Sequence, residues 1–389
     1  MIYLDNAAST AVHPEVIKEM MPYFDSEYGN PSSIHQFGRK AKNAIQKARK
    51  QVAALIGAEP DEILFTSGGT ESNNTILYGI PNFRESHFDQ NHIITSSIEH
   101  EAVLQPCKEF EKNGTKITYL PVDEHGIVNP DDITNATSPE TVLVSIMFAN
   151  NEVGTIQPIK EISEICKKYQ IPLHTDAVQA VGKVPVNSKE LGVDALSISS
   201  HKINGPKGVG ALFIKKGLTI NPQILGGGQE NGMRSGTENV ASIVGFGKAC
   251  EIAKDKLSNN ISHFQTLHSS MLSKIVKEIP HVKLNGHPEK RIFNNIHLTF
   301  LGVNGEDLII KLDEHGIAAS TGSACSVHTQ KASHVLKAMG FNHEQITGSL
   351  RISFGYMNTL DEVEQAVEVL KKVVAELRSV SPYKTKYNF

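Results

Sequence analysis

A lysine that follows a short β-rich run is the first residue of this chain with an evident chemical use. Lys202 ends the run Ser199-Ser200-His201-Lys202, directly after the expected strand 195–199 and before a Gly-Pro-Lys-Gly turn. A lysine amine at the carboxyl end of a buried strand can attack a carbonyl carbon and form a Schiff base. An isolated lysine is more often a solvated surface residue, so the companions of Lys202 decide its use.

An aspartate at the end of another expected strand is such a companion. Asp176 follows the run 171–175, and the carboxyl edge of a parallel sheet is where its ligands bind. A carboxylate there can pair with a protonated heterocycle nitrogen, whereas an aspartate alone could simply cap the next helix. Lys202, Asp176 and the hydroxyl and imidazole donors beside the lysine together form the arrangement needed to hold pyridoxal phosphate, whose ring acts as an electron sink.

A glycine-containing run could hold the phosphate of such a cofactor. Thr66-Ser67-Gly68-Gly69-Thr70-Glu71-Ser72-Asn73 follows the expected strand 63–66 and opens an expected helix. Glycines let the backbone approach an anion, and the positive end of the helix dipole favours phosphate there. By itself, the run is equally consistent with a strand-to-helix turn that has a capping threonine.

Short β-rich runs alternate with helical stretches up to about residue 238, and they determine where these side chains stand. After an N-terminal strand at 1–4, the expected strands are 63–66, 92–96, 116–121, 141–148, 171–175, 195–199 and 209–214. The expected helices include one that opens near Pro14, 37–56, 101–112 and 160–169. This alternation is typical of βαβ units, and helices on both faces of a mostly parallel sheet would bury the apolar strands. The fold class is therefore α/β.

The pattern changes after about residue 238. A long helical stretch leads to Pro280, strands are expected at 295–300 and 350–354, and helices start at Glu306 and Asp361. We expect a large domain over 15–260 with a mixed, mostly parallel sheet. A smaller α+β domain is expected over 261–389, and residues 1–14 join it.

Composition and charge exclude several kinds of partner. The 38 Lys and Arg residues stand against 42 Asp and Glu, and a formal charge of −4 leaves no broad basic face for nucleic acid or an anionic membrane. The best apolar run, 142–149, is far shorter than the roughly 18 residues of a membrane-spanning helix. We expect neither a nucleic-acid nor a membrane partner.

The cysteines and several missing motifs narrow the chemistry further. Cys107, Cys166, Cys250 and Cys325 form no CxxC pair, so a structural zinc site is not expected and reduced thiols are the simplest interpretation. Residues 1–5 do not show a basic region followed by an apolar stretch, so a signal peptide is not expected and we expect a cytoplasmic location. A P-loop, an HExxH zinc motif, a GxSxG elbow and a GxGxxG fingerprint are all absent from the sequence.

Ten ordered motifs together carry a resemblance to a known family. They are Tyr-Leu-Asp-Asn-Ala-Ala at 3–8, Gly-Asn-Pro-Ser-Ser at 29–33, the run at 66–73, Glu-His at 99–100, Ala-Asn-Asn-Glu at 149–152, Asp-Ala-Val-Gln at 176–179, Ser-Ser-His-Lys at 199–202, Arg-Ser-Gly-Thr at 234–237, Ser-Ala-Cys at 323–325 and Leu-Arg at 350–351. In these motifs the chain resembles the cysteine desulfurases of the NifS and IscS type, in class V of the pyridoxal-phosphate aminotransferases. The resemblance implies the fold type I of pyridoxal-phosphate transferases.

The resemblance implies a role for each matched cofactor residue. Lys202 would form the Schiff base, Asp176 would pair with the ring nitrogen, Gln179 would hydrogen-bond the phenolic oxygen, and His100 would stack on the ring. The residues implied for the phosphate are Gly69, Thr70, Ser199 and His201, with Thr237 from a second subunit. A homodimer is therefore expected.

The resemblance also implies the substrate and the reaction. Asn151 and Arg351 would hold the carboxylate of L-cysteine, which suits the bidentate geometry of a guanidinium. The catalytic residues would be Cys325, Lys202 and His100. Cys325 would take the sulfur as a persulfide, leave L-alanine, and pass the sulfur to a protein acceptor such as an iron–sulfur scaffold or a tRNA-thiolation protein. No resident metal is implied, although Cys325 could ligate an iron–sulfur cluster transiently.

Three alternatives remain at this point. A selenocysteine lyase or another class V pyridoxal enzyme would share most of these motifs, although Cys325 in its Ser-Ala-Cys setting argues against an aminotransferase. A non-catalytic sulfur or iron–sulfur scaffold of the same fold would be expected to lack the Schiff-base lysine, whereas this chain has Lys202 at that position.

The segment from Val327 to Ala332 departs from the run common among relatives, which bears on how sulfur is passed on.

Overall fold

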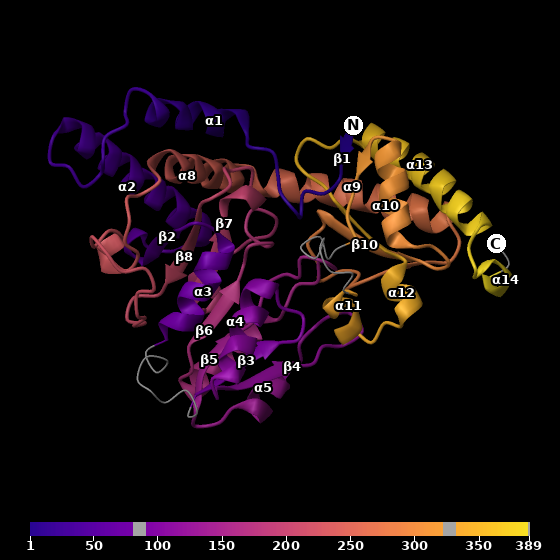
Figure 1. Ribbon diagram of the computed structural model, residues 1–389, viewed down its shortest axis with the longest axis horizontal. Coiled ribbons are helices and arrows are strands. Elements are labelled where there is room, and N and C mark those ends of the chain that lie inside the picture. The colour runs from indigo at the N-terminus through magenta and orange to yellow at the C-terminus, as the bar shows by residue number, and fades with distance from the viewer. Residues whose placement is uncertain (81–90, 322–331, 388–389) are drawn as a thin grey trace.

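Two lobes make up the molecule (Figure 1). The computed structural model describes residues 1–80, 91–321 and 332–387 of the 389-residue chain. The larger lobe is built around a seven-stranded sheet, and the smaller lobe contains a three-stranded sheet. The N-terminal strand lies with the C-terminal part of the chain in the smaller lobe (Figure 1).

The large sheet is parallel apart from one strand. Its strand order is β2-β8-β7-β6-β5-β3-β4. Strand β8 runs antiparallel to both of its neighbours, and the other pairings are parallel. The strands are β2 (Ile63–Thr66), β3 (His92–Ser96), β4 (Lys116–Leu120), β5 (Thr141–Ser145), β6 (Leu173–Asp176), β7 (Ala195–Ser199) and β8 (Gly210–Ile214).

Successive residues of these strands alternate between two apolar cores. Phe65, Ile94 and Val144 belong to one core, whereas their neighbours Leu64 and Ile93 belong to the other. This follows from the two-residue period of a strand, and it requires helices on both faces of the sheet. The helices of this lobe are α1 (Pro14–Met20), α2 (Gln36–Ile56), α3 (Gly69–Gly79), α4 (Glu101–Lys112), α5 (Pro130–Ala136), α6 (Ile159–Tyr169), α7 (Ser188–Leu191) and α8 (Val240–Asp255).

The smaller lobe packs helices on an antiparallel sheet of order β12-β10-β9. Its core takes residues from both ends of the chain, since Leu4 is buried there with Phe264 and Val367. Its strands are β9 (Val282–Leu284), β10 (Asn295–Phe300) and β12 (Ser349–Ser353), with the parallel pair β1 (Ile2–Tyr3) and β11 (Ile317–Ala318). Its helices are α9 (Leu257–Glu278), α10 (Gly305–Glu314), α11 (His334–Ala338), α12 (His343–Thr347), α13 (Leu360–Ser379) and α14 (Lys384–Tyr387).

Local sequence explains where the longer helices begin and end. The His35 ring accepts a hydrogen bond from the amide of Gly38 at the start of α2, and Gly57 ends that helix with a φ of 67° that suits glycine. Thr359 and Glu362 form a capping box at the start of α13. These ends agree closely with the sequence expectation. The stretch expected to be helical from 238 to Pro280 is two helices, α8 and α9, because the chain leaves helical geometry at Lys256.

The domain limits follow from the two cores. Residues Phe264 and Leu267 of α9 lie in the smaller core together with Leu4. We therefore propose the limits 15–260 for the large domain and 261–389 with 1–14 for the small one. No helix in the described ranges combines the length and apolar character needed to cross a membrane.

Candidate active site

A cavity of about 350 Å³ lies where the parallel strands of the large sheet end. The carboxyl ends of parallel strands share one edge of a sheet, so residues distant in sequence converge there. The predicted residues that line the cavity are Gly69, Thr70, His100, Asn151, Asp176, Gln179, Ser199, His201, Lys202 and Arg351. Ala7 and Ala8 from the N-terminal segment also line it.

Lys202 stands on a short 3₁₀ turn directly after β7. Its Nζ donates hydrogen bonds to the carbonyl oxygens of Ala7 and Ala8, at 2.6 and 2.8 Å. The side-chain amide of Gln179 donates to the same oxygen of Ala7 at 3.0 Å. The N-terminal segment therefore holds the side chains of Lys202 and Gln179. Its position within the motif at residues 3–8 is the sequence signal that could have indicated this role.

Asp176 is the last residue of β6 and is oriented by two donors. Its Oδ2 accepts a hydrogen bond from the side-chain amide of Asn73 at 2.7 Å, and its Oδ1 accepts one from the amide of Val178 at 3.0 Å. Asn73 is almost fully buried on α3. Sequence reasoning placed Asn73 in the run at 66–73 but gave it no role, and the fold shows that it fixes the carboxylate.

The amino end of α3 faces the same cavity. Gly68 occupies the cap position and makes no side-chain capping hydrogen bond. A Cβ atom on Gly69 would come within 2.7 Å of a methyl group of Val178, so only glycine leaves the backbone this close to its surroundings. Amide groups at an uncapped helix start and the hydroxyl of Thr70 offer several donors to an anion.

The two histidines of the cavity are in different electrostatic settings. Burial and the charge of Lys202 lower the pKa of His201 to about 4, so its imidazole is neutral at neutral pH. His100 caps α4, where its Nδ1 accepts a hydrogen bond from the amide of Ala102 at 3.1 Å. Because Nδ1 is an acceptor, neutral His100 carries its proton on Nε2.

A carboxyl group next to His100 is buried away from solvent. Glu99 accepts hydrogen bonds on Oε1 from the hydroxyl of Ser96 and the amide of Met147, at 2.6 and 2.9 Å. Its Oε2 has no partner within the described ranges. Burial, aided by the negative charge of Asp176, raises the pKa of Glu99 to about 8. Glu99 is therefore a protonated, neutral acid in the neutral pH range.

Arg351 lies on β12 of the smaller sheet and reaches the cavity from that side. Its Nη2 donates to the carboxylate of Asp5 at 2.9 Å, and its Nη1 donates to the backbone oxygen of Asn151 at 3.0 Å. Its backbone pairs with Ser320 in both directions, at 2.6 and 3.2 Å. Asp5 is a second residue for which sequence reasoning proposed no individual role.

Two predicted residues stand apart from this group. Thr237 lines a separate hollow, together with Ser67 and Arg234, and does not line the cavity around Lys202. Cys325 lies outside the described residues. The other cysteines, Cys107, Cys166 and Cys250, are buried and unpaired, and burial raises the pKa of each thiol.

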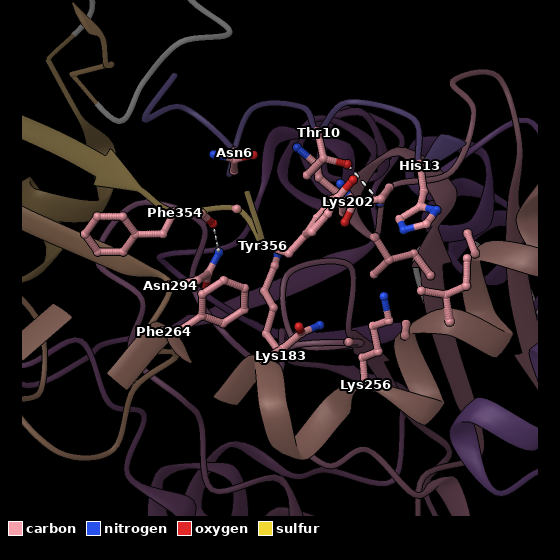
Figure 2. Close-up of a pocket in the computed structure, with 18 residues that line it drawn as sticks. Asn6, Thr10, His13, Lys183, Lys202, Lys256, Phe264, Asn294, Phe354 and Tyr356 are labelled. Carbon is pink, nitrogen blue, oxygen red and sulfur yellow. Dashed lines mark hydrogen bonds between the residues drawn. The ribbon is translucent and has the colours of Figure 1, made fainter. Parts of the chain in front are cut away.

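The side chains that meet in the cavity match the chemical groups of one kind of ligand. An amine, a carboxylate and a helix start on one wall suit a ligand that has a carbonyl carbon, a basic ring nitrogen and a phosphate. An arginine on the opposite lobe suits a carboxylate. A second, smaller cavity of about 50 Å³ also has Lys202 among its lining residues (Figure 2).

Comparisons with known proteins agree with this chemistry. Residues 2–366 match the family "Aminotransferase class-V". The chain is 50% identical to "Cysteine desulfurase IscS" of Methanosarcina thermophila, over 98% of this chain and 94% of that protein. The solved structure "NIFS-like protein" matches with a TM-score of 0.90 and 40% identity, over 96% of this chain and 99% of that one. The structure "SspA in complex with cysteine" matches with a TM-score of 0.80 and 35% identity, over 91% of this chain and 99% of that one.

Proposed function

Because the chain belongs to the class-V aminotransferase family and is a cysteine desulfurase, we propose that it takes sulfur from L-cysteine at the cavity around Lys202. Pyridoxal phosphate would be the cofactor, L-alanine the second product, and Cys325 the residue that receives the sulfur. The observation that carries this assignment is the meeting of Lys202 and Asp176 with an uncapped helix start in one cavity.

The residues of the cavity fit pyridoxal phosphate. When bound, this cofactor stabilises negative charge at the α-carbon of an attached amino acid. Lys202 would hold its carbonyl carbon, and Asp176 would hold its ring nitrogen with Asn73 keeping the carboxylate in place. The phosphate would be held by Gly69, Thr70, Ser199 and His201, and His100 would cover the ring.

Arg351 and Asn151 would hold the carboxylate of the substrate. Each terminal nitrogen of a guanidinium carries two hydrogens, and Asp5 and the backbone of Asn151 each take one. A guanidinium can present two parallel N–H donors, the geometry that a carboxylate accepts in bidentate fashion. Asp5 would therefore keep Arg351 oriented rather than block it.

Lys202 and His100 would move the protons. Lys202 is the amine in the cavity that can take the α-proton of the substrate. His100 would assist the later protonations through Nε2, since its Nδ1 is held by the amide of Ala102, and it would donate a proton only from its imidazolium form.

The thiolate of Cys325 would remove the sulfur. It attacks the sulfur atom of the substrate, a new sulfur–sulfur bond forms, and the carbon–sulfur bond breaks. The electron pair of that bond stays on the carbon, which takes up a proton and becomes the methyl group of alanine. Cys107, Cys166 and Cys250 are poor candidates, since burial keeps each of them a protonated thiol.

The active unit would be a homodimer. Thr237 does not line the cavity of its own chain, which leaves it available to a neighbouring one. Large apolar side chains are exposed near the N-terminus and could be covered in a dimer, namely Met21, Phe24, Tyr28 and Ile34. The sulfur would pass to a protein such as an iron–sulfur scaffold or a tRNA-thiolation protein, in the cytoplasm.

A direct assay tests the activity. Purified protein is supplied with pyridoxal phosphate, L-cysteine and a thiol reductant, and alanine and sulfide are measured. The expected result is one alanine for each sulfide released. A protein that binds pyridoxal phosphate but forms no alanine from cysteine would contradict the proposed reaction.

A further inference from the structure

Lys183 is a buried lysine that the reaction described above does not use. It lies in the turn that follows β6, and only 6% of its surface is exposed. Its Nζ donates a hydrogen bond to Oε1 of Gln179 at 2.9 Å. In the ranges that the structure describes, this is its only hydrogen bond, and no carboxylate forms an ion pair with it.

No acidic residue of the described ranges lines the small cavity beside Lys183 or forms an ion pair with it. Lys202 and Lys256 are among the other residues that line this cavity (Figure 2). Removing an ammonium group from water without a counter-ion costs several kcal/mol. In agreement, burial and the charges of Lys202 and Arg351 lower the pKa of Lys183 to about 7. Because burying the Lys183 ammonium group here reduces the stability of the fold, its presence indicates a role other than stabilisation.

The hydrogen bonds of Gln179 indicate that role. The oxygen of its side-chain amide accepts from Lys183, and the nitrogen of the amide donates to the carbonyl oxygen of Ala7. Below its pKa, Lys183 is protonated and can only donate, so the amide oxygen of Gln179 faces it. Gln179 lines the larger cavity together with Ala7 and Lys202, and its side-chain nitrogen has a second hydrogen besides the one given to Ala7.

We propose that Lys183 is a positioning residue, which turns the amide of Gln179 so that a hydrogen-bond donor faces the cofactor cavity. The proposal rests on the proposed function and on the role that the resemblance implies for Gln179, a hydrogen bond to the phenolic oxygen of pyridoxal phosphate. Without Lys183, the amide of Gln179 could rotate and present its oxygen, which repels that phenolic oxygen.

The test uses the apoprotein, with pyridoxal phosphate as the probe. The variants are Lys183→Met, Gln179→Ala and the double variant. Titration calorimetry gives the dissociation constant of pyridoxal phosphate, and absorbance spectra of the loaded proteins are recorded across pH. Lys183→Met should weaken binding about fivefold to tenfold, the effect of one lost hydrogen bond. The pH midpoint of the absorbance change should rise, because a phenolic oxygen with fewer donors keeps more negative charge.

The double variant separates positioning from any independent effect of Lys183. If Lys183 acts through Gln179, Lys183→Met should change neither the affinity nor the midpoint further once Gln179 is alanine. Lys256→Met is the matched control, because it removes a lysine that lines the same small cavity and is not among the hydrogen-bond partners of Gln179 in the described residues. It should leave both measurements at the wild-type value.

Melting temperatures provide a second measurement. Since Lys183 is an uncompensated buried charge, Lys183→Met should melt at or above the wild-type temperature, whereas a structural lysine would lower it on removal. Lys183→Arg keeps a donor and should bind pyridoxal phosphate like the wild type. It tests the proposal even if the methionine variant does not fold.

Two results would overturn the proposal while leaving the proposed function intact. One is a wild-type affinity and spectrum in Lys183→Met. The other is additive losses in the double variant. Failure of the wild-type protein itself to bind pyridoxal phosphate is a different result, and it would reject the proposed function.

Discussion

Lys202 and Gln179 donate hydrogen bonds to one shared acceptor, the carbonyl oxygen of Ala7, at 2.6 and 3.0 Å. Ala7 follows the strand β1, which pairs with β11 of the smaller lobe. Under the proposed domain limits, the acceptor belongs to the small lobe and both donors belong to the large one. This contact ties the position of the amine of Lys202 to the way the two lobes pack.

Replacing Lys202 with alanine should abolish both turnover and the visible absorbance of bound pyridoxal phosphate. Among the residues that the structure describes, Lys202 is the only lysine that lines the large cavity, and this variant removes it. Absorbance spectroscopy and alanine formation measure the two losses. Lys207→Ala is a suitable control, since Lys207 is exposed five residues further along the chain and does not line that cavity. Full activity in Lys202→Ala would show that this cavity is not the active site.

Replacing Arg351 with lysine should raise the KM for cysteine at least tenfold while leaving the affinity for pyridoxal phosphate unchanged. A single ammonium group cannot contact Asp5, the backbone of Asn151 and a substrate carboxylate with the parallel donors of a guanidinium. Initial rates against cysteine concentration give KM. Arg378→Lys is the control, because Arg378 donates to carbonyl groups far from the cavity. An unchanged KM in Arg351→Lys would place the substrate elsewhere.

Glu99 should make the stability of the protein fall between pH 5 and pH 8. The unfolded chain ionises Glu99 near pH 4.5, whereas the folded chain keeps its proton up to about pH 8. The stabilising contribution is thus complete below pH 4.5 and lost as the pH rises towards 8. Glu99→Gln has no such titration. The free energy of unfolding of the variant, relative to that of the wild type, should therefore be roughly 2–4 kcal/mol higher at pH 8 than at pH 5.

Urea unfolding at pH 5 and pH 8 measures that difference. Glu161→Gln, on the exposed side of α6, is the control and should follow the wild type at both values. An equal difference between Glu99→Gln and the wild type at the two pH values would show that the Glu99 carboxyl is already ionised in the folded protein.

A mixed dimer should show whether Thr237 serves the partner subunit. If each site combines Lys202 of one chain with Thr237 of the other, a dimer of one Lys202→Ala chain and one Thr237→Ala chain contains one intact site. Coexpressed and purified mixed dimers should therefore bind pyridoxal phosphate at half of their sites with wild-type affinity. If all remaining sites bound it as weakly as the Thr237→Ala homodimer, Thr237 would serve its own chain.

Periodic and motif-based features of the structure could be predicted from the sequence. Strands such as β2 and β7 are bounded by turn residues and alternate between two cores, so their limits were confirmed. The seven-stranded, mostly parallel sheet was also confirmed. The break at Lys256 was not predicted, because no proline or glycine marks it and apolar residues continue on both sides.

Contacts between distant residues were beyond prediction. Asn73 meets Asp176 across 103 positions, and Asp5 meets Arg351 across 346, through contacts that exist only once the sheet and both lobes are assembled. Both residues stand within recognised motifs, which was the available signal. Lys183 had no such signal, because nothing in the sequence distinguishes it from an exposed lysine.

Replacing Cys325 with serine should stop alanine formation but leave pyridoxal phosphate binding intact. The residues proposed to hold the cofactor lie in the cavity around Lys202 and do not include the cysteine. The variant should stay yellow, and its spectrum should still respond to added cysteine. Cys107→Ala, Cys166→Ala and Cys250→Ala are the controls and should keep their alanine yield, apart from a stability loss from the cavity each creates.

The location of the transferred sulfur tests the account most directly. Wild-type protein turning over L-cysteine with isotopically labelled sulfur is trapped with an alkylating agent, digested and examined by mass spectrometry. The account predicts one additional labelled sulfur on the peptide that contains Cys325, and none on Cys107, Cys166 or Cys250. Labelled sulfur on one of those three buried cysteines, or alanine formed without any protein persulfide, would contradict it.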